Sequence, residues 1–121
     1  MEFLKRVGIR PMAYASLGAV GTDGVVPRPE RPQNLLTHPT VGALAEKHGR
    51  SAGQVLLNWG LQRGHIVIPK TTQEKRLREN WEAQQFALDE EEVEALTALD
   101  CGYRAFNALL MARYGNIPVF E

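Results

Sequence analysis

Only two segments of this 121-residue chain have the pattern of a β-strand. The first is the short apolar stretch from Ile9 to Ala15, and the second is the β-branched run Ile66-Val67-Ile68, which Pro69 ends. A short apolar run between helical segments is typical of a strand buried in a parallel sheet. Two parallel strands cannot close such a sheet, so the chain is expected to be part of a larger fold and incomplete on its own.

Helical patterns precede each of the predicted strands. The opening residues Glu2 to Gly8 predict the end of an amphipathic helix that a glycine stops. Pro39 to His48 is predicted to form a second helix, with Gly49 as its stop. Ser51 is then expected to cap a third helix, which continues to Gln62.

Two further helices are predicted after the second strand. A charged helix is expected to begin at a Thr72 cap and to run through Trp81. The next helix opens at Leu88 with acidic side chains in its first turn, and its inward positions are Val93, Leu96 and Leu99. The order of elements is that of two consecutive βα units, which predicts an α/β fold. In it the Ser51 to Gln62 helix would pack on two neighbouring parallel strands.

Residues 19–39 and 101–121 lack a regular pattern. Glycines and prolines recur between Gly18 and Pro39, so this stretch is expected to be a long surface loop. It could fold over a bound ligand as a lid or be disordered, and the sequence leaves both open. The tail that begins at Cys101 is rich in aromatic and apolar side chains.

Charge and cysteine content exclude several classes of partner. The 14 basic and 14 acidic side chains cancel, so no field of one sign favours nucleic acid or an anionic membrane. Cys101 is the single cysteine, which leaves neither an internal disulfide nor a zinc-type spacing. No apolar run approaches the roughly 18 residues of a membrane span. The composition suits a cytoplasmic protein for which no metal is expected.

The end of the second predicted strand has the chemistry of an anion site. This strand delivers Lys70 and Thr71 to the C-terminal edge of a sheet, where a helix begins, so backbone N–H groups and the helix dipole point at one place. Arg76 adds a planar guanidinium suited to phosphate oxygens. Asn80 lies one turn further on the same helix face, and Glu79 flanks it. Two cations and an amide suit a phosphorylated nucleotide.

The alternative is that these charges form an ordinary solvated helix face. Three basic side chains would then pair with three acidic ones at helical spacing, namely Lys75, Arg76 and Arg78 with Glu74, Glu79 and Glu82. Charge alone favours this alternative. The strand, the turn that follows it and the expected helix cap favour the ligand site.

Three segments together resemble the aldo-keto reductase family in their order and spacing. They are Ala13-Tyr14-Ala15-Ser16-Leu17-Gly18, Gln54-Val55-Leu56-Leu57-Asn58-Trp59, and Ile68-Pro69-Lys70-Thr71 continuing to Arg76 and Glu79-Asn80. The resemblance covers about Phe3 to Leu99. It implies the C-terminal part of a (β/α)8 TIM barrel, about two βα units with a C-terminal helix and tail. It also implies a partial NADP-dependent oxidoreductase domain over residues 1–121.

The resemblance implies NADPH as the cofactor. Lys70, Thr71 and Arg76 look like the residues that grip its 2'-phosphate, with Glu79 and Asn80 at the adenine. A preference for NADPH over NADH is therefore expected. A barrel of this type often holds phosphate at the loops after its last two strands.

The first segment resembles the family's nicotinamide and pyrophosphate contacts. Tyr14 lies where the family stacks an aromatic ring on the nicotinamide, and Ser16, Leu17 and Gly18 lie where backbone groups meet the pyrophosphate. Ala15 departs from the family, which often has serine there, and removes one hydroxyl contact. The second segment carries no chemistry and is predicted to be an apolar helix stripe that packs on the sheet. In the family, the C-terminal tail borders the substrate pocket.

No catalytic residue is assigned in this sequence. The family's reaction needs a tyrosine acid with a neighbouring lysine, aspartate and histidine, which belong to the first half of the barrel and are absent here. Tyr103 and Tyr114 lie in the tail, and no histidine falls at a strand end with a carboxylate partner.

These observations predict the cofactor-binding C-terminal part of an NADPH-dependent reductase of aldehydes or ketones, inactive as a lone chain. Its small-molecule carbonyl substrate would be bound only by the complete protein. Unpaired strand edges could bind a second copy or a complementing chain. The alternative is a non-catalytic, reductase-derived small protein that binds a nucleotide or a protein partner.

Overall fold

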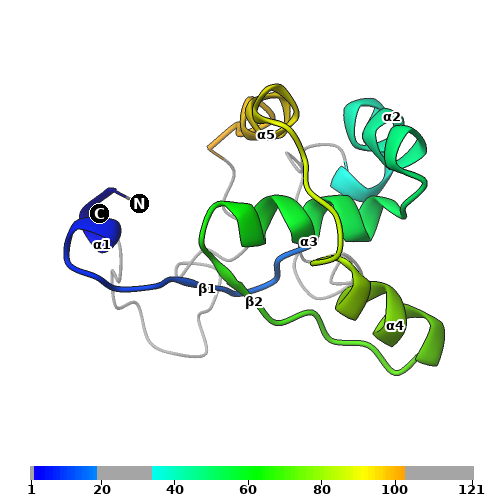
Figure 1. Ribbon diagram of the computed structural model, residues 1–121, viewed down its shortest axis with the longest axis horizontal. Helices are drawn as coiled ribbons and strands as arrows, with labels where there is room; N and C mark the ends of the chain where they lie inside the picture. The colour runs from blue at the N-terminus through cyan, green and yellow to red at the C-terminus, as the bar shows by residue number, and fades with distance from the viewer. Residues whose placement is uncertain (1, 19–33, 103–121) are drawn as a thin grey trace, which may run out of the picture.

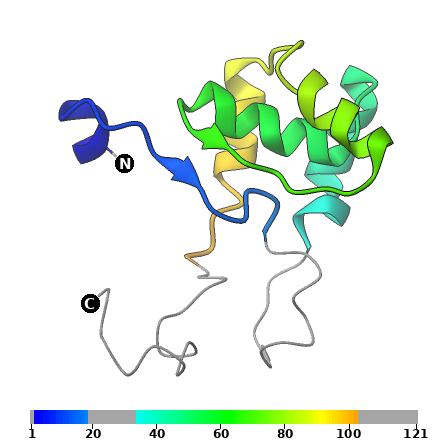
Figure 2. The ribbon, with the colours of Figure 1, turned by 90° about the horizontal axis from the view of Figure 1, so that it is seen from below.

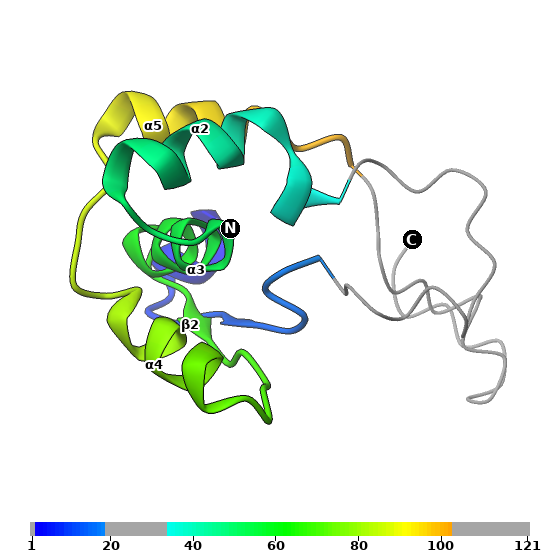
Figure 3. The ribbon, with the colours of Figure 1, turned by 90° about the vertical axis from the view of Figure 1, so that its right-hand side faces the viewer.

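The computed structural model describes residues 2–18 and 34–102, which form an α/β arrangement (Figure 1). Its elements are α1 (Glu2–Arg6), β1 (Met12–Ala13), the 3-10 helix η1 (Leu35–Thr37), α2 (Pro39–His48), α3 (Ala52–Gln62), β2 (Ile66–Val67), α4 (Glu74–Glu82) and α5 (Glu90–Thr97). Helix α3 lies in the middle, with α2 and α5 on one side and β2 and α4 on the other (Figure 3). Helix α1 is set apart from the other helices (Figure 2).

The two strands pair in parallel, with Met12 opposite Ile66 and Ala13 opposite Val67. The predicted neighbouring parallel strands are therefore confirmed, although β1 is shorter than the predicted Ile9 to Ala15. The strand ends at Ala13 because a turn follows directly after it, in which Ala15 has a positive φ of 56°. Before the strand, the Pro11 carbonyl accepts a hydrogen bond from the Ile66 N–H at 2.9 Å.

Helix α3 begins at a capping box and contacts both layers around it. The Ser51 hydroxyl accepts from the Gln54 N–H at 3.3 Å, and the Gln54 side chain accepts from the Ser51 N–H at 3.0 Å. The predicted Ser51 cap is thus confirmed. On the sheet side, a Cβ at Gly60 would lie 3.1 Å from the Val67 side chain, so helix and strand approach closely there.

The apolar stripe of α3 faces the other helices. Val55 and Leu56 form the buried core together with Val41 of α2, Leu88 in the turn before α5, and Leu96 of α5. The prediction that this stripe packs on the sheet is wrong. Helix α3 is covered on more than one side, so its apolar positions do not identify which neighbour each one meets.

Helix α2 begins and ends where the sequence predicts, and α5 begins at Glu90, two residues after the predicted opening at Leu88. Gly49 ends α2 in the left-handed conformation, at φ 59°. The Asp89 side chain accepts from the Glu92 N–H, and the Glu92 side chain accepts from the Asp89 N–H, both at 2.8 Å. This second capping box starts α5, whose Leu96 is buried as predicted.

Helix α4 begins later than predicted. Its N-cap is Gln73, whose side chain makes no capping bond, so the predicted Thr72 cap is wrong. The Thr71 hydroxyl instead accepts from the Gln73 N–H at 3.1 Å. Such a local threonine turn competes with helix capping, and it moves the helix start to Glu74.

Most of the predicted loop 19–39 and of the tail 101–121 lies outside the described residues. At the end of the loop, regular structure returns before Pro39, because Leu35–Thr37 form η1. The Asn34 side chain starts this turn by accepting from the Leu36 N–H at 3.0 Å. Among the described helices, none is long and apolar enough to cross a membrane.

Candidate functional site

A hollow of about 850 Å³ lies where the two parallel strands end. Its walls come from the turn after β1, the segment after β2, the first turn of α3 and one side of α4. The lining residues are Tyr14, Ala15, Ser16, Leu17, Leu36, Ser51, Ala52, Gly53, Ile68, Pro69, Lys70, Arg76, Glu79 and Asn80. Parallel strands bring their carboxyl ends to the same edge, which is where ligands of open α/β sheets bind.

Seven of the nine predicted site residues line this hollow. They are Tyr14, Ser16, Leu17, Lys70, Arg76, Glu79 and Asn80. The two that do not line it are Gly18 and Thr71. Gly18 closes the turn after β1, where its N–H donates to the Ala15 carbonyl at 2.9 Å and its φ is 79°. The Thr71 hydroxyl is used in the local turn before α4.

The turn after β1 forms one wall. The Ser16 hydroxyl donates to the Ala13 carbonyl at 3.1 Å, which holds the turn against the end of its own strand. Leu17 is half-buried and packs against the hydrophobic core. Tyr14 lines the hollow and is 76% exposed. The wall therefore combines a fixed backbone with an accessible aromatic ring.

Arg76, Glu79 and Asn80 share one face of α4 because they are three and four residues apart. The neighbouring basic residues have intrahelical partners. Lys75 Nζ lies 3.9 Å from Glu79, and Arg78 donates to Glu74 at 2.8 Å. Solvated helix pairs are therefore confirmed for Lys75 and Arg78.

Glu82, the third acidic residue of the alternative, pairs with Arg50 at 3.6 Å instead. Within residues 2–18 and 34–102, no carboxylate lies in ion-pair distance of Arg76 or Lys70. Both cations line the hollow. The described part of the chain thus leaves two positive charges there for an anionic ligand.

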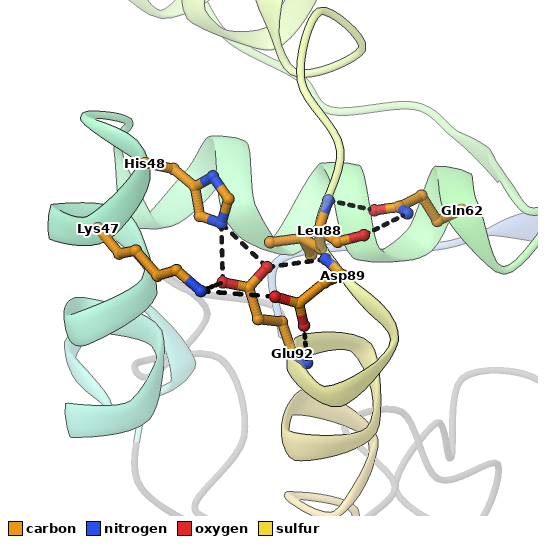
Figure 4. Close-up of polar contacts among 6 residues, drawn as sticks. All are labelled: Lys47, His48, Gln62, Leu88, Asp89 and Glu92. Carbon is orange, nitrogen blue, oxygen red and sulfur yellow. Dashed lines mark hydrogen bonds and ion pairs between the residues drawn. The ribbon is translucent and has the colours of Figure 1, made fainter.

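A second polar cluster joins α2 to α5 and shares no residue with the hollow (Figure 4). Glu92 is 5% exposed, and its carboxylate contacts Lys47 at 2.8 Å and His48 at 2.9 and 3.0 Å. Burial alone would raise the pKa of Glu92. Hydrogen bonds from Lys47, the Asp89 backbone and His48 outweigh burial and lower this pKa to about 2. The hydrogen bond to Glu92 and the negative charges of Glu92 and Asp89 raise the pKa of Lys47.

The cluster has a structural role. Beside it, the Gln62 amide exchanges two hydrogen bonds of 2.9 Å with the backbone of Leu88, which fixes the start of α5 on α3. Sequence reasoning missed the His48 to Glu92 contact, because the two residues are 44 positions apart and no local signal joins them.

His65 lies at the opposite end of β2 from the hollow. Its Nε2 is buried and has no hydrogen-bond partner among the residues that the structure describes. Burial lowers the pKa of His65, and Arg63 and Lys5 lower it further. None of the three histidines lines the hollow, and the described residues contain no group of three or more His, Cys, Asp or Glu that could hold a metal ion.

The chain belongs to the aldo/keto reductase family, because residues 1–101 match the sequence model of that family. It is 44% identical to an NAD(P)H-dependent pentose reductase of Pyricularia oryzae over 86% of this chain and 32% of that protein. It is 36% identical to a probable NAD(P)H-dependent D-xylose reductase of Aspergillus terreus, over 99% of this chain and 37% of that protein. The chain thus spans about a third of the length of these curated relatives.

Solved structures agree with this assignment. The chain resembles the crystal structure of a Bombyx mori aldo-keto reductase in complex with NADP, with a TM-score of 0.80 and 32% identity. The match covers 97% of this chain and 36% of that one. A second neighbour, an aldo-keto reductase from a deep-sea metagenome, has a TM-score of 0.73 at 27% identity. Such reductases are TIM barrels, and this chain is α/β and corresponds to part of one.

Proposed function

We propose that this chain is the C-terminal, cofactor-binding part of an NADPH-dependent aldo-keto reductase that reduces aldehydes or ketones to alcohols. The observation that carries the proposal is the hollow at the strand ends, which gathers seven of the nine residues expected at the cofactor. The names of the relatives support the same cofactor class, since they include NAD(P)H-dependent pentose and D-xylose reductases. A pentose-like sugar is therefore the substrate class to test first.

The residues present fit a cofactor with a phosphate on its ribose. Lys70 supplies a point charge and Arg76 a planar fork of donors, and both line the hollow together with Asn80. The first turn of α4 adds backbone N–H groups without a side-chain cap, whose partial positive charge also favours an anion. In this proposal, the α4 side of the hollow holds the 2'-phosphate and adenine. Tyr14 stacks on the nicotinamide, and the turn from Ser16 to Gly18 meets the pyrophosphate.

We expect the chain alone to be inactive. When bound, the reduced cofactor supplies hydride to a carbonyl carbon, and the carbonyl oxygen needs an acid at the same time. The titratable side chains that line the hollow are Tyr14, Lys70, Arg76 and Glu79, and the phosphate already engages the two cations. No described histidine or aspartate stands near them to complete an acid group. In the proposal, that group belongs to the remaining part of the barrel.

The test uses two ligands that differ only by the proposed phosphate contact. Adenosine 2',5'-bisphosphate and AMP are titrated into the 121-residue chain. The signal is tryptophan fluorescence, to which Trp59 on α3 and Trp81 on α4 contribute. Tighter binding of the bisphosphate is expected, by about tenfold, which is the effect of one charge-assisted contact of about 1.4 kcal/mol. Equal binding of the two ligands, or binding of neither, would contradict the proposal.

A further inference from the structure

Three amide side chains form a row along one side of α3. They are Gln54, Asn58 and Gln62, which are four residues apart and therefore project from the same side of the helix. Gln54 and Asn58 are 4% and 2% exposed. Burying an amide is costly unless it is hydrogen-bonded, and all three bond to the segment from Glu82 to Leu88. The row thus ties α3 to the end of α4 and to the segment that leads to α5.

Asn58 makes the contacts that hold α4. Its Nδ2 donates to the Ala83 carbonyl at 2.8 Å and to the Phe86 carbonyl at 2.7 Å. Ala83 is the C-cap of α4 and is fully buried. Gln54 adds a weaker contact one turn earlier on α3, from its Nε2 to the Glu82 carboxylate at 3.5 Å. A single buried amide nitrogen therefore fixes both the C-terminal end of α4 and the turn after it.

Helix α4 has few other constraints in the described part of the chain. None of its residues is buried there, and no side chain caps its N-terminus. Its large apolar side chains, Leu77 and Trp81, are mostly exposed. Tertiary packing is what normally fixes a helix, so a helix that buries little surface depends more on directional hydrogen bonds. The bonds from Asn58 are the shortest that α4 and its cap receive from α3.

The held end of α4 and the proposed phosphate site lie on the same helix. Arg76 is seven residues before Ala83 in the sequence, which corresponds to about 10 Å along an α-helix. A tilt of about 10° at Ala83 would therefore displace the backbone at Arg76 by about 2 Å. A hydrogen bond between a guanidinium and a phosphate needs about 2.7 to 2.9 Å from nitrogen to oxygen, so a displacement of this size disrupts it.

We propose that Asn58 is a positioning residue of the phosphate site, although it does not line the hollow. It fixes the C-terminal end of α4 and so holds Arg76 and Asn80 where the phosphorylated ribose of the cofactor meets them. The inference rests on the proposed cofactor site and adds to it a residue without ligand contact. The alternative is that Asn58 only stabilises the fold.

The test compares two variants that each remove two hydrogen bonds of the row. Asn58→Leu has a similar shape and loses both bonds to the end of α4. Gln62→Leu is the matched control, because its two bonds of 2.9 Å to Leu88 hold the start of α5 (Figure 4). Adenosine 2',5'-bisphosphate and AMP are titrated into wild type and both variants of the 121-residue chain. The measured quantity is the ratio of the two dissociation constants.

The wild-type preference for the bisphosphate, about tenfold, should fall to about threefold or less in Asn58→Leu, since only the bisphosphate loses a contact. The preference should stay unchanged in Gln62→Leu. A purely structural role would lower the folded fraction and weaken both ligands alike, which leaves the ratio unchanged. A wild-type ratio in Asn58→Leu, or an equal fall in Gln62→Leu, would overturn the proposal.

A second variant covers the case in which Asn58→Leu does not fold, as judged by circular dichroism. Gln54→Glu keeps an acceptor for the Ser51 N–H, so the capping box of α3 remains. It places a second carboxylate beside Glu82, for which the described residues supply only Arg50. The repulsion should displace the end of α4 and lower the ratio as well. An unchanged ratio in this variant would then overturn the proposal.

Hydrogen exchange separates this proposal from the cofactor proposal, because it needs no nucleotide. Relative to α2, the amides of α4 should exchange about tenfold faster in Asn58→Leu, since losing a hydrogen bond lowers the free energy of local opening. Gln62→Leu should leave this relative rate unchanged. Faster exchange with no wild-type preference for the bisphosphate would refute the cofactor site and leave Asn58 as the residue that fixes α4. Wild-type exchange in Asn58→Leu would refute the positioning of α4, whichever nucleotide binds.

Discussion

Replacing Arg76 by alanine tests the phosphate site most directly. Arg76 lines the hollow, and the described part of the chain provides no carboxylate in ion-pair distance of it. In the proposal its guanidinium bonds to the 2'-phosphate of NADPH, and NADH has no group at that place. The substitution should therefore weaken NADPH and leave NADH nearly unchanged.

The expected loss follows from the kind of contact. A hydrogen bond to a charged group contributes about 1.5 to 3 kcal/mol, which corresponds to roughly 10- to 100-fold in dissociation constant. Arg76 is exposed, so solvent and salt screen the contact and place the loss near the lower end. Raising the ionic strength should reduce the preference for NADPH in the wild type and have a smaller effect in the variant, which keeps the Lys70 contact.

The assay uses a chimera in which this chain replaces the matched segment of the Pyricularia oryzae pentose reductase. Fluorescence titration of both cofactors into wild type and Arg76→Ala gives four dissociation constants. Arg78→Ala is the matched control, because Arg78 is on the same helix, is paired with Glu74 at 2.8 Å and does not line the hollow. Losing that exposed pair should cost about 0.3 to 0.5 kcal/mol of stability and leave the NADPH to NADH ratio unchanged.

Equal weakening of both cofactors by Arg76→Ala would refute the reasoning, since a general loss of folding acts on both alike. The same change in ratio from Arg78→Ala would refute it too. That result would mean that the helix acts through its total charge rather than through one side chain.

Three further predictions concern stability and are measured by urea unfolding of the 121-residue chain, followed by circular dichroism. The pKa of Glu92 is lowered from 4.5 to about 2 in the folded chain, so its carboxylate stabilises the fold above pH 5, and this contribution is lost as the pH falls toward 2. At pH 6, Glu92→Gln should lower the free energy of unfolding by about 2 kcal/mol, which is less than the full pKa shift implies because Lys47 is exposed. The difference in stability between wild type and variant should shrink toward pH 2, and a difference that stays constant with pH would contradict the assignment. Gly60→Val should destabilise by about 1 to 3 kcal/mol, since its Cβ would lie 3.1 Å from Val67 and neither side can move freely. Gly42→Ala, in an open part of α2, should instead stabilise by about 0.5 to 1 kcal/mol, and a loss there would show that helix propensity does not dominate.

The sequence predicts those elements whose signals are local. Ser51 and Asp89 start their helices by bonding residues three positions ahead, and Gly49 ends α2 through its own φ. Thr72 shows the limit of such signals, because Thr71, Thr72 and Gln73 are all possible starts and the hydrogen bond from the Gln73 N–H to Thr71 decides among them. Local sequence signals thus predict that a helix is present more securely than they predict the residue at which it begins.

Contacts between distant segments could not be predicted in the same way. Lys47 and His48 meet Glu92 because α2 and α5 lie on the same side of α3 (Figures 3 and 4). The apolar pattern of α3 identified its core residues, Val55 among them, but not the neighbour that each one meets. Burial and hydrogen bonding fix those neighbours only once the helices are in place.

The hollow could be predicted from the sequence because its parts follow two strands that pair in parallel. Tyr14 comes directly after β1, and Lys70 follows shortly after β2, so the parallel register alone brings them to one edge. This register depends on Ala13 and Val67 sharing the face toward α3, where Gly60 leaves room for the close approach. If β1 paired with β2 one residue out of register, Met12 would point toward α3 in place of Ala13. The turn after β1 would then be displaced along the sheet relative to the segment after β2. The residue that carries no chemistry, Gly60, therefore helps to set the geometry of the proposed cofactor site.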